Sequence, residues 1–355
     1  MTKFRIFSLA KLAVIAFAFL ALVSCNEEKT ESKISPQSDT NSTPKIAVGI
    51  SKIIMHPALD TVEYAIKEVL ASRGFSVEYD LQNANGDINT AGAIAAKFKD
   101  QRPNVVVGIG TPMAVSLAAA IKDIPIVFST VTDPIGAKLV STVEHGEGNI
   151  TGVSDAIPSD EHLRIFKEIA GIKTLGYIYT SNEANSVSAL EIVQSAAKKL
   201  DIKLITQSIS KTEEVKQAAE AIAGRVDGIY LSTDNVVFSA LPSVINAFAK
   251  AGKPIFAGDA TQARSGGGCL IFMGVNYYKV GLATGEIVAQ ILNGTSPDKI
   301  PVKFMNEPSE SDFVIDLDVV KKLKITIPES YLLQATAFIK DGKYIEKDKI
   351  EVDEN

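Results

Sequence analysis

Residues 108–134 read GIGTPMAVSLAAAIKDIPIVFSTVTDP and contain two successive strand-to-turn units. The apolar run Val105–Val107 predicts a strand, and Thr111-Pro112 predicts the start of an alanine-rich helix after a glycine-containing turn. The run 124–128 predicts the next strand, and Thr132-Asp133-Pro134 predicts the turn or helix that follows it. In both turns a small polar residue precedes proline, which is typical of an N-cap followed by the first helical position.

Turns of this kind lie at the carboxyl ends of the strands in a doubly wound sheet, which is where such sheets bind ligands. A helix N-terminus offers free N–H groups and a favourable dipole to a carboxylate. The two adjacent turns therefore predict a site for a small anionic or zwitterionic solute.

The same alternation of strands and helices extends over the chain from Lys45 onward. In the first half we expect strands at 46–51, 77–81, 105–107 and 124–128, with helices at 57–73, 87–100 and from 111 onward. In the second half we expect strands at 175–179, 203–209, 227–231 and 254–257, with helices at 186–200, 213–223 and 238–251. The tail predicts a helix at 277–293, extended segments at 301–302 and 313–315, and helical regions at 317–324 and 328–339. Two such series predict an α/β fold with two lobes, each built on a parallel sheet covered on both faces.

Length and charge restrict the class of protein. A chain of 355 residues exceeds the length at which one core usually keeps growing, so two domains are expected. The formal net charge is −6, and no long basic run is present. Because phosphate neutralisation needs clustered Lys and Arg, no nucleic-acid partner is expected.

The amino terminus has the pattern of a secretory signal. Lys3 and Arg5 precede the apolar run 12–23, which is too short to span a bilayer and ends at Ser24-Cys25. Residues 22–25, LVSC, resemble a bacterial lipobox, so we expect residues 1–24 to be removed and Cys25 to be acylated, with palmitate among the acyl groups. An ordinary secretory signal with a coincidental cysteine is the alternative. Residues 25–43 are rich in Ser, Thr and charge, and predict a flexible tether.

Several runs, taken in their order and spacing, resemble the extracytoplasmic substrate-binding proteins of ABC transporters, the family that includes tryptophan- and tyrosine-binding lipoproteins. The runs are 45–51, 56–60, 83–87, 110–112, 125–128, 131–134, 149–155, 183–186 and 232–235. The resemblance implies a type I periplasmic-binding-protein fold with two Rossmann-like lobes, three crossovers and a ligand in the cleft between the lobes. It implies lobe 1 at 44–155 and 275–305, and lobe 2 at 156–274 and 306–350. It also implies an amino acid as solute, with an aromatic one favoured, an ABC permease and ATPase as partners, and attachment to the extracytoplasmic side of a bacterial membrane by the lipid.

Polar residues at the strand-to-helix turns are the candidate ligand-binding residues. They are Thr111, Pro112, Thr132, Asp133, Asn185, Ser186, Asp234, Asn235 and Asp259. For an amino acid, we expect its carboxylate at Thr111, aided by Thr132. Its ammonium needs an anion, for which Asp234 ranks first and Asp259 second. Each of these residues can also be a helix cap and nothing more.

Enzyme motifs are missing from the sequence. Met113 stands where a dinucleotide fingerprint needs its third glycine, and the Gly-Lys-Ser/Thr end of a P-loop is absent. His145 and His162 are expected on the surface, and His56 in either the cleft or a loop cap, without metal spacing. Cys269 is expected to be a small buried residue. We therefore expect no catalytic residues, cofactor or metal, and the alternative function is a solute sensor reporting to a membrane receptor rather than to a permease.

Overall fold

The computed structural model describes residues 45–349. The predicted signal peptide, the predicted acylation at Cys25 and the predicted tether lie outside the described residues. No helix within 45–349 is long and apolar enough to cross a membrane.

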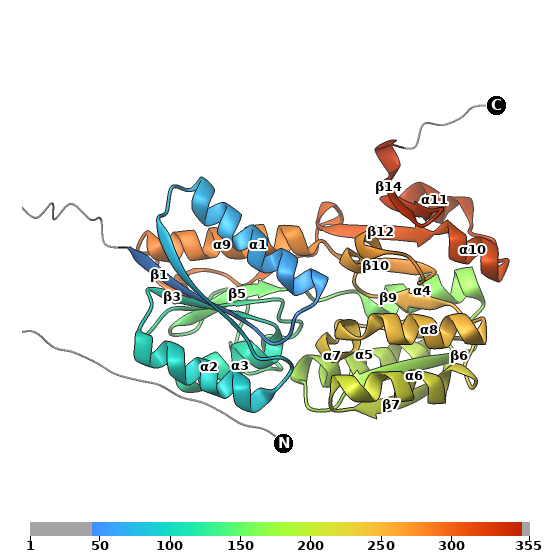
Figure 1. Ribbon diagram of the computed structural model, residues 1–355, viewed down its shortest axis with the longest axis horizontal. Coiled ribbons are helices and arrows are strands. Elements are labelled where there is room, and N and C mark those ends of the chain that lie inside the picture. The colour runs from blue at the N-terminus through green and yellow to red at the C-terminus, as the bar shows by residue number, and fades with distance from the viewer. Residues whose placement is uncertain (1–44, 350–355) are drawn as a thin grey trace, which may run out of the picture. The chain divides into compact units, whose positions relative to one another are not determined.

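The first sheet is parallel throughout and has the order β11-β5-β4-β3-β1-β2. Its strands are β1 (Ile46–Lys52), β2 (Val77–Asn83), β3 (Val105–Ile109), β4 (Ile126–Ser129), β5 (Ile150–Ser154) and β11 (Lys303–Phe304). Its helices are α1 (Pro57–Ser72), α2 (Ile88–Gln101), α3 (Thr111–Ala120) and α9 (Tyr277–Leu292). Helix α1 packs against α9 on one face and α2 against α3 on the other (Figure 1), so the apolar central strands are buried on both sides.

The second sheet has the order β14-β13-β12-β10-β9-β8-β6-β7 and is parallel except at the pairs β10–β12 and β13–β14. Its strands are β6 (Thr174–Thr180), β7 (Lys203–Ile209), β8 (Gly228–Leu231), β9 (Ile255–Ala257), β10 (Ile271–Val275), β12 (Ser311–Asp316), β13 (Ala337–Lys340) and β14 (Lys343–Glu346). The helices are α4 (Ser159–Ala170), α5 (Ala184–Lys199), α6 (Val215–Ala223), α7 (Asn235–Ser239), α8 (Leu241–Ala251), α10 (Leu317–Leu323) and α11 (Glu329–Gln334). The predicted α/β architecture with two mostly parallel sheets is confirmed.

The chain passes between the two sheets after β5, after β10 and after β11. The last part of the first sheet therefore comes from residues that follow most of the second sheet in the sequence. The division of the chain into lobes at the residue numbers given above stays a prediction.

Two glycines of α9 allow it to approach α1 closely. A β-carbon at Gly281 would lie 2.6 Å from the Ala65 β-carbon and 2.7 Å from the Val62 carbonyl oxygen. A β-carbon at Gly285 would lie 2.7 Å from the Val69 β-carbon. Because real side chains do not approach that closely, this helix pair depends on both glycines.

The predicted N-caps of the opening segment are wrong. Gly110, with a φ of 91°, is the N-cap of α3, and Thr111 is its first residue. Such a φ suits glycine, which has no β-carbon to clash. After Thr132-Asp133-Pro134 the chain forms a turn and not a helix, which is one of the two expected outcomes, and Asp133 Oδ1 accepts a hydrogen bond from the Gly136 amide at 2.7 Å.

Three further expectations are corrected. The helical region predicted at 328–339 ends at Gln334, because Ala337–Lys340 pairs with β12 as a strand. The helix predicted at 238–251 is two helices that meet at Ala240, since Pro242 in the first turn of α8 has no N–H to continue the ladder. His162 is buried rather than exposed, and its Nδ1 lies 3.1 Å from the Tyr230 hydroxyl. His145 is exposed and Cys269 is buried, both as predicted.

Candidate functional site

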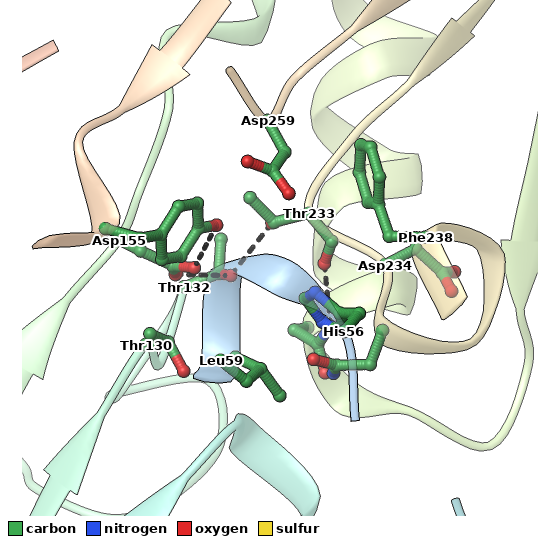
Figure 2. A pocket seen from close by; sticks show the side chains of 12 residues that line it. His56, Leu59, Thr130, Thr132, Asp155, Thr233, Asp234, Phe238 and Asp259 are labelled. Carbon is green, nitrogen blue, oxygen red and sulfur yellow. Dashed lines mark hydrogen bonds between the residues drawn. The ribbon is translucent and has the colours of Figure 1, made fainter. Parts of the chain in front are cut away.

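A pocket lies where the carboxyl ends of strands from both sheets meet (Figure 2). Its cavity volume is about 10 Å³, which is room for about one water molecule, so the two sides of the pocket lie close together in this structure. The lining residues are His56, Leu59, Thr130, Thr132, Asp155, Asn185, Thr233, Asp234, Asn235, Phe238, Asp259 and Tyr277. The first sheet contributes the turns after β4 and β5, and the second sheet the turns after β8 and β9. This is the edge at which parallel sheets bind ligands.

One corner of the pocket is acidic. Asp155 is buried and accepts hydrogen bonds from the Thr132 hydroxyl at 2.9 Å and from the Tyr277 hydroxyl at 3.0 Å. Asp259 is also buried, and its Oδ1 accepts a hydrogen bond from the Thr261 amide at 2.8 Å. Asp259 Oδ2 makes no hydrogen bond of good geometry within the described chain, although the Gln262 amide is near enough to lower the pKa of Asp259.

The pKa values of both carboxyl groups reflect this burial. Removal from water raises the pKa of Asp155, and it raises the pKa of Asp259 to about 6, with a further contribution from the negative charge of Asp155. The pocket lining contains no Lys or Arg. Two buried acids without a cationic side chain beside them form a site that a ligand cation would stabilise.

Asp234 has a different environment. Its Oδ1 accepts hydrogen bonds from the Thr180 hydroxyl at 2.7 Å and the Val237 amide at 3.0 Å. Its Oδ2 accepts from the Thr180 amide at 2.8 Å and the Ser186 hydroxyl at 2.6 Å. The carboxylate caps α7 and joins it to the end of β6, so its acceptor sites are occupied by protein donors.

A buried acid, Glu183, lies behind the pocket and holds two amide side chains. Glu183 Oε2 accepts hydrogen bonds from Asn235 Nδ2 at 2.8 Å and from Asn185 Nδ2 at 3.2 Å. The same Asn185 nitrogen donates to the Thr233 carbonyl oxygen at 2.9 Å. Burial, together with the charge of Asp234, raises the pKa of Glu183 to about 8. Asn185 Oδ1 is buried and has no partner within the described chain.

His56 and two apolar side chains complete the lining. His56 lies at the N-cap position of α1 but makes no side-chain cap hydrogen bond, and both ring nitrogens lack a partner among the described residues. Burial lowers its pKa to about 4, so the ring is neutral at pH 7. Leu59 of α1 and Phe238 of α7 are buried and provide apolar surface from opposite sheets. Figure 2 shows His56 on the opposite side of the Thr132–Thr233 contact from Asp155.

Two hydrogen bonds join the segments of the two sheets at the pocket. The Thr132 and Thr233 hydroxyl oxygens are 3.0 Å apart, and Thr233 is the donor because the Thr132 hydroxyl donates to Asp155. The Ser188 hydroxyl donates to Asp133 Oδ2 at 3.2 Å. These contacts hold the two sides of the pocket together in this structure.

Some of the predicted site residues line the pocket and others do not. Thr132, Asn185, Asp234, Asn235 and Asp259 line the pocket. The lining does not include Thr111, Pro112, Asp133 and Ser186. Thr111 is buried and its hydroxyl has no partner within residues 45–349, Asp133 accepts from Ser188, and Ser186 donates to Asp234. Their roles toward a ligand stay predictions.

Sequence reasoning did not place Leu59, Thr130, Asp155, Phe238 and Tyr277 among the candidates. Asp155 directly follows β5, so the rule that selected Asp259 after β9 could have found it. Leu59 and Phe238 give no such signal, because buried apolar residues on helices are usual in any core. Within residues 45–349, no group of three His, Cys, Asp or Glu side chains is arranged to hold a metal ion.

Known proteins resemble this chain over most of its length. Residues 47–339 match the model of a family described as ABC transporter substrate binding protein. A tyrosine-binding protein from Clostridioides difficile (strain R20291) is 32% identical over 307 residues, which are 85% of this chain and 88% of that protein.

Solved structures resemble it as well. The ABC domain from Streptococcus pneumonia in complex with L-Trp is 31% identical over 83% of this chain and 100% of that chain, with a TM-score of 0.79. The ligand-free, open structure of a substrate binding protein with adhesive properties from Clostridium difficile is 33% identical over 80% of this chain and 96% of that chain, with a TM-score of 0.60. Two further structures at 14% identity share the fold, with TM-scores of 0.53 and 0.58.

Proposed function

Because the chain belongs to the family of ABC transporter substrate-binding proteins, we propose that its pocket binds an amino acid with an aromatic side chain. Its fold is that of the type I periplasmic binding proteins, as predicted. Members of this family are solute-binding proteins, so the chain is a binding protein and not an enzyme. The tyrosine-binding relative and the L-Trp complex support an aromatic solute.

The observation that carries the proposal is the acidic corner. An amino acid brings an ammonium group, and Asp259 Oδ2 is a buried acceptor without a partner in the described chain. Asp155 lies in the same lining and adds a second negative charge. Asp234 already accepts four hydrogen bonds from the protein, so the proposal places Asp259 ahead of Asp234 as the ammonium partner. The carboxylate partner stays a prediction, because Thr111 is outside the lining and the Thr132 hydroxyl donates to Asp155.

The aromatic ring is proposed to lie on the His56 side of the pocket. Leu59 and Phe238 supply apolar contacts there from the two sheets, and His56 is a neutral ring at pH 7. Aromatic rings pack well against such surfaces, by apolar burial and by edge or offset stacking. The ammonium and the ring would then lie on opposite sides of the Thr132–Thr233 contact.

Ligand binding is expected to close the two lobes and to stabilise the protein. The structure is more similar to the L-Trp complex than to the open ligand-free relative at nearly equal identity, which supports a closed arrangement here. L-Tyr or L-Trp at a hundred times its dissociation constant should stabilise the native state by about 2.7 kcal/mol. Thermal unfolding should show a higher melting temperature, and small-angle scattering a smaller radius of gyration. A bound amino acid that left both quantities unchanged would contradict closure.

The partners of the closed protein are proposed to be an ABC permease and its ATPase, which import the solute. A sensor that reports to a membrane receptor is the alternative, because it needs the same closed lobes. Deleting the gene should abolish uptake of radiolabelled L-Tyr or L-Trp if the protein serves an importer. Normal uptake combined with a lost transcriptional response to the amino acid would favour the sensor.

The lipid anchor is proposed from the sequence alone. Processing before Cys25 should leave a mature protein with an acylated first residue that fractionates with membranes. Stable attachment needs more than one acyl chain, because a single chain anchors only marginally. Cys25→Ser should accumulate as unprocessed or released protein, and Cys269→Ser, which changes the buried cysteine, should still be acylated. Mass spectrometry of the natural amino terminus that finds an unmodified start elsewhere would refute the anchor.

A further inference from the structure

We propose that the Asn185 side-chain oxygen selects solutes whose ring carries a hydrogen-bond donor, such as the phenol of tyrosine or the indole N–H of tryptophan, over the plain phenyl ring of phenylalanine. The inference rests on the proposed function, since it takes the pocket to bind an aromatic amino acid. It assigns a role to Asn185 and to the buried acid Glu183 that supports it.

The hydrogen bonds of Asn185 determine which way its amide points. Its Nδ2 lies 3.2 Å from Glu183 Oε2 and 2.9 Å from the Thr233 carbonyl oxygen. The Thr233 carbonyl is an acceptor in every protonation state, and Glu183 keeps an accepting oxygen whether or not it is ionised, so the amide nitrogen must face them. The oxygen then faces away from them as a fixed acceptor. Glu183 is thus a positioning residue for Asn185.

The side-chain oxygen of Asn185 is a buried hydrogen-bond acceptor, and no residue of the described chain donates to it. Asn185 is about 3% exposed and lines the pocket, and its Oδ1 has no hydrogen-bond partner among the described residues. The neutral His56 ring, whose two nitrogens are equally unpartnered, lies in the same lining and can offer either a donor or an acceptor. A buried polar group that stays unpaired costs free energy, so a solute that donates to it gains over one that cannot.

The ammonium group has a separate place in this arrangement. The acidic corner is formed by Asp155 and Asp259. Figure 2 shows these two side chains on the opposite side of the Thr132–Thr233 contact from His56. A solute that puts its ammonium at that corner leaves its ring on the side of Leu59 and Phe238, and the proposal places the ring substituent at the Asn185 oxygen, which is in the same lining. The selecting group is therefore the ring substituent and not the backbone of the amino acid.

The test compares L-Tyr, L-Trp and L-Phe by titration calorimetry on the full mature chain. The parent protein should bind L-Tyr or L-Trp roughly 10- to 100-fold more tightly than L-Phe. Asn185→Leu keeps a similar volume and removes the acceptor, so it should weaken the preferred amino acid and reduce its preference over L-Phe to within about threefold. Asn89→Leu, at an exposed position on α2, is the matched control and should keep the parent's preference.

Glu183→Gln provides a second variant that leaves Asn185 in place. A Gln side chain keeps an oxygen that can accept from Asn185, and the Thr233 carbonyl accepts in every state, so Asn185 should keep its orientation and the preference over L-Phe should be retained. Equal binding of all three amino acids to the parent, or an unchanged preference in folded Asn185→Leu, would overturn the role of Asn185 and leave the proposed function intact. Failure of the parent to bind any of the three would overturn the proposed function and this inference together.

Discussion

Replacing Asp259 by Asn is expected to weaken binding of the amino acid by about 2–5 kcal/mol, which is a loss of at least ~30-fold in affinity. The reason is that the ligand ammonium would lose a charged partner inside a pocket that has few waters to replace it. The Asp259 side chain is about 1% exposed and its Oδ2 has no other partner in the described chain. Titration calorimetry at pH 7.5 measures the change. Asp298→Asn, at an exposed position outside the pocket, should bind as the parent does.

The pH dependence of the parent protein gives an independent check on Asp259. Burial raises its pKa to about 6 in the unliganded protein, and an ammonium binds only the ionised form. The logarithm of the association constant should therefore fall by about one unit per pH unit as the pH drops below about 6. This dependence should be weaker in Asp259→Asn, in which Asp155 remains as an acid of that corner. If Asp234→Asn abolishes binding while Asp259→Asn binds within about threefold of the parent, the ammonium partner is Asp234 instead.

The stability of the unliganded protein should change with pH in the opposite direction to its affinity for the amino acid. The folded-state pKa of Asp259 is about 6, above the ordinary value of 3.8, so the folded state takes up a proton before the unfolded chain does. Between pH 6 and 4 this group makes the native state more stable as the pH falls. Asp259→Asn removes the buried charge, so it should unfold at a higher temperature than the parent at pH 7.5 although it binds less tightly.

The second large effect is expected at Gly281, where an alanine should lower the free energy of unfolding by about 2 kcal/mol. Its β-carbon would lie 2.6 Å from the Ala65 β-carbon and 2.7 Å from the Val62 carbonyl oxygen, so α9 and α1 would have to separate. This cost exceeds the gain in helix propensity, which is about 1 kcal/mol for glycine to alanine. Chemical denaturation, followed by circular dichroism, measures the difference.

Gly92 is the matched control for that substitution. It also lies inside a helix of the first sheet, α2, but a β-carbon there would meet no atom within 4 Å. Gly92→Ala should therefore stabilise the protein by up to about 1 kcal/mol. Opposite signs for the same change at two helical glycines would assign the effect at Gly281 to packing. Destabilisation of both variants by the same amount would contradict this explanation.

Most of the fold could be predicted because parallel strands are buried on both faces and appear in the sequence as continuous apolar runs. Val105–Ile109 and Ile126–Ser129 are of this kind, and both are strands. The segment 337–339 was expected to be helical, because a short apolar run does not distinguish a helix from a strand. The segment is a strand because it pairs with β12, which lies more than twenty residues away in the chain.

The candidate site was predictable where a polar residue lies between the end of a strand and the first turn of the next helix. Thr132, Asn185 and Asp259 lie in such connections, and all three line the pocket. The burial of Glu183 could not be predicted, because it depends on amide groups from two turns that meet only in the folded protein. His162 was misplaced for the same reason, since its partner Tyr230 lies 68 residues further along the chain.

The return of the chain to the first sheet has a consequence for synthesis on the ribosome. The sheet that begins at Ile46 receives α9 and β11 only after residue 304 has been made, when β6 to β10 of the other sheet are already complete. Until then the α1 surface formed by Val62, Ala65 and Val69 has no helix to cover it. The amino-terminal half of the nascent chain therefore lacks part of its final packing until residues 277–304 have been made, late in synthesis.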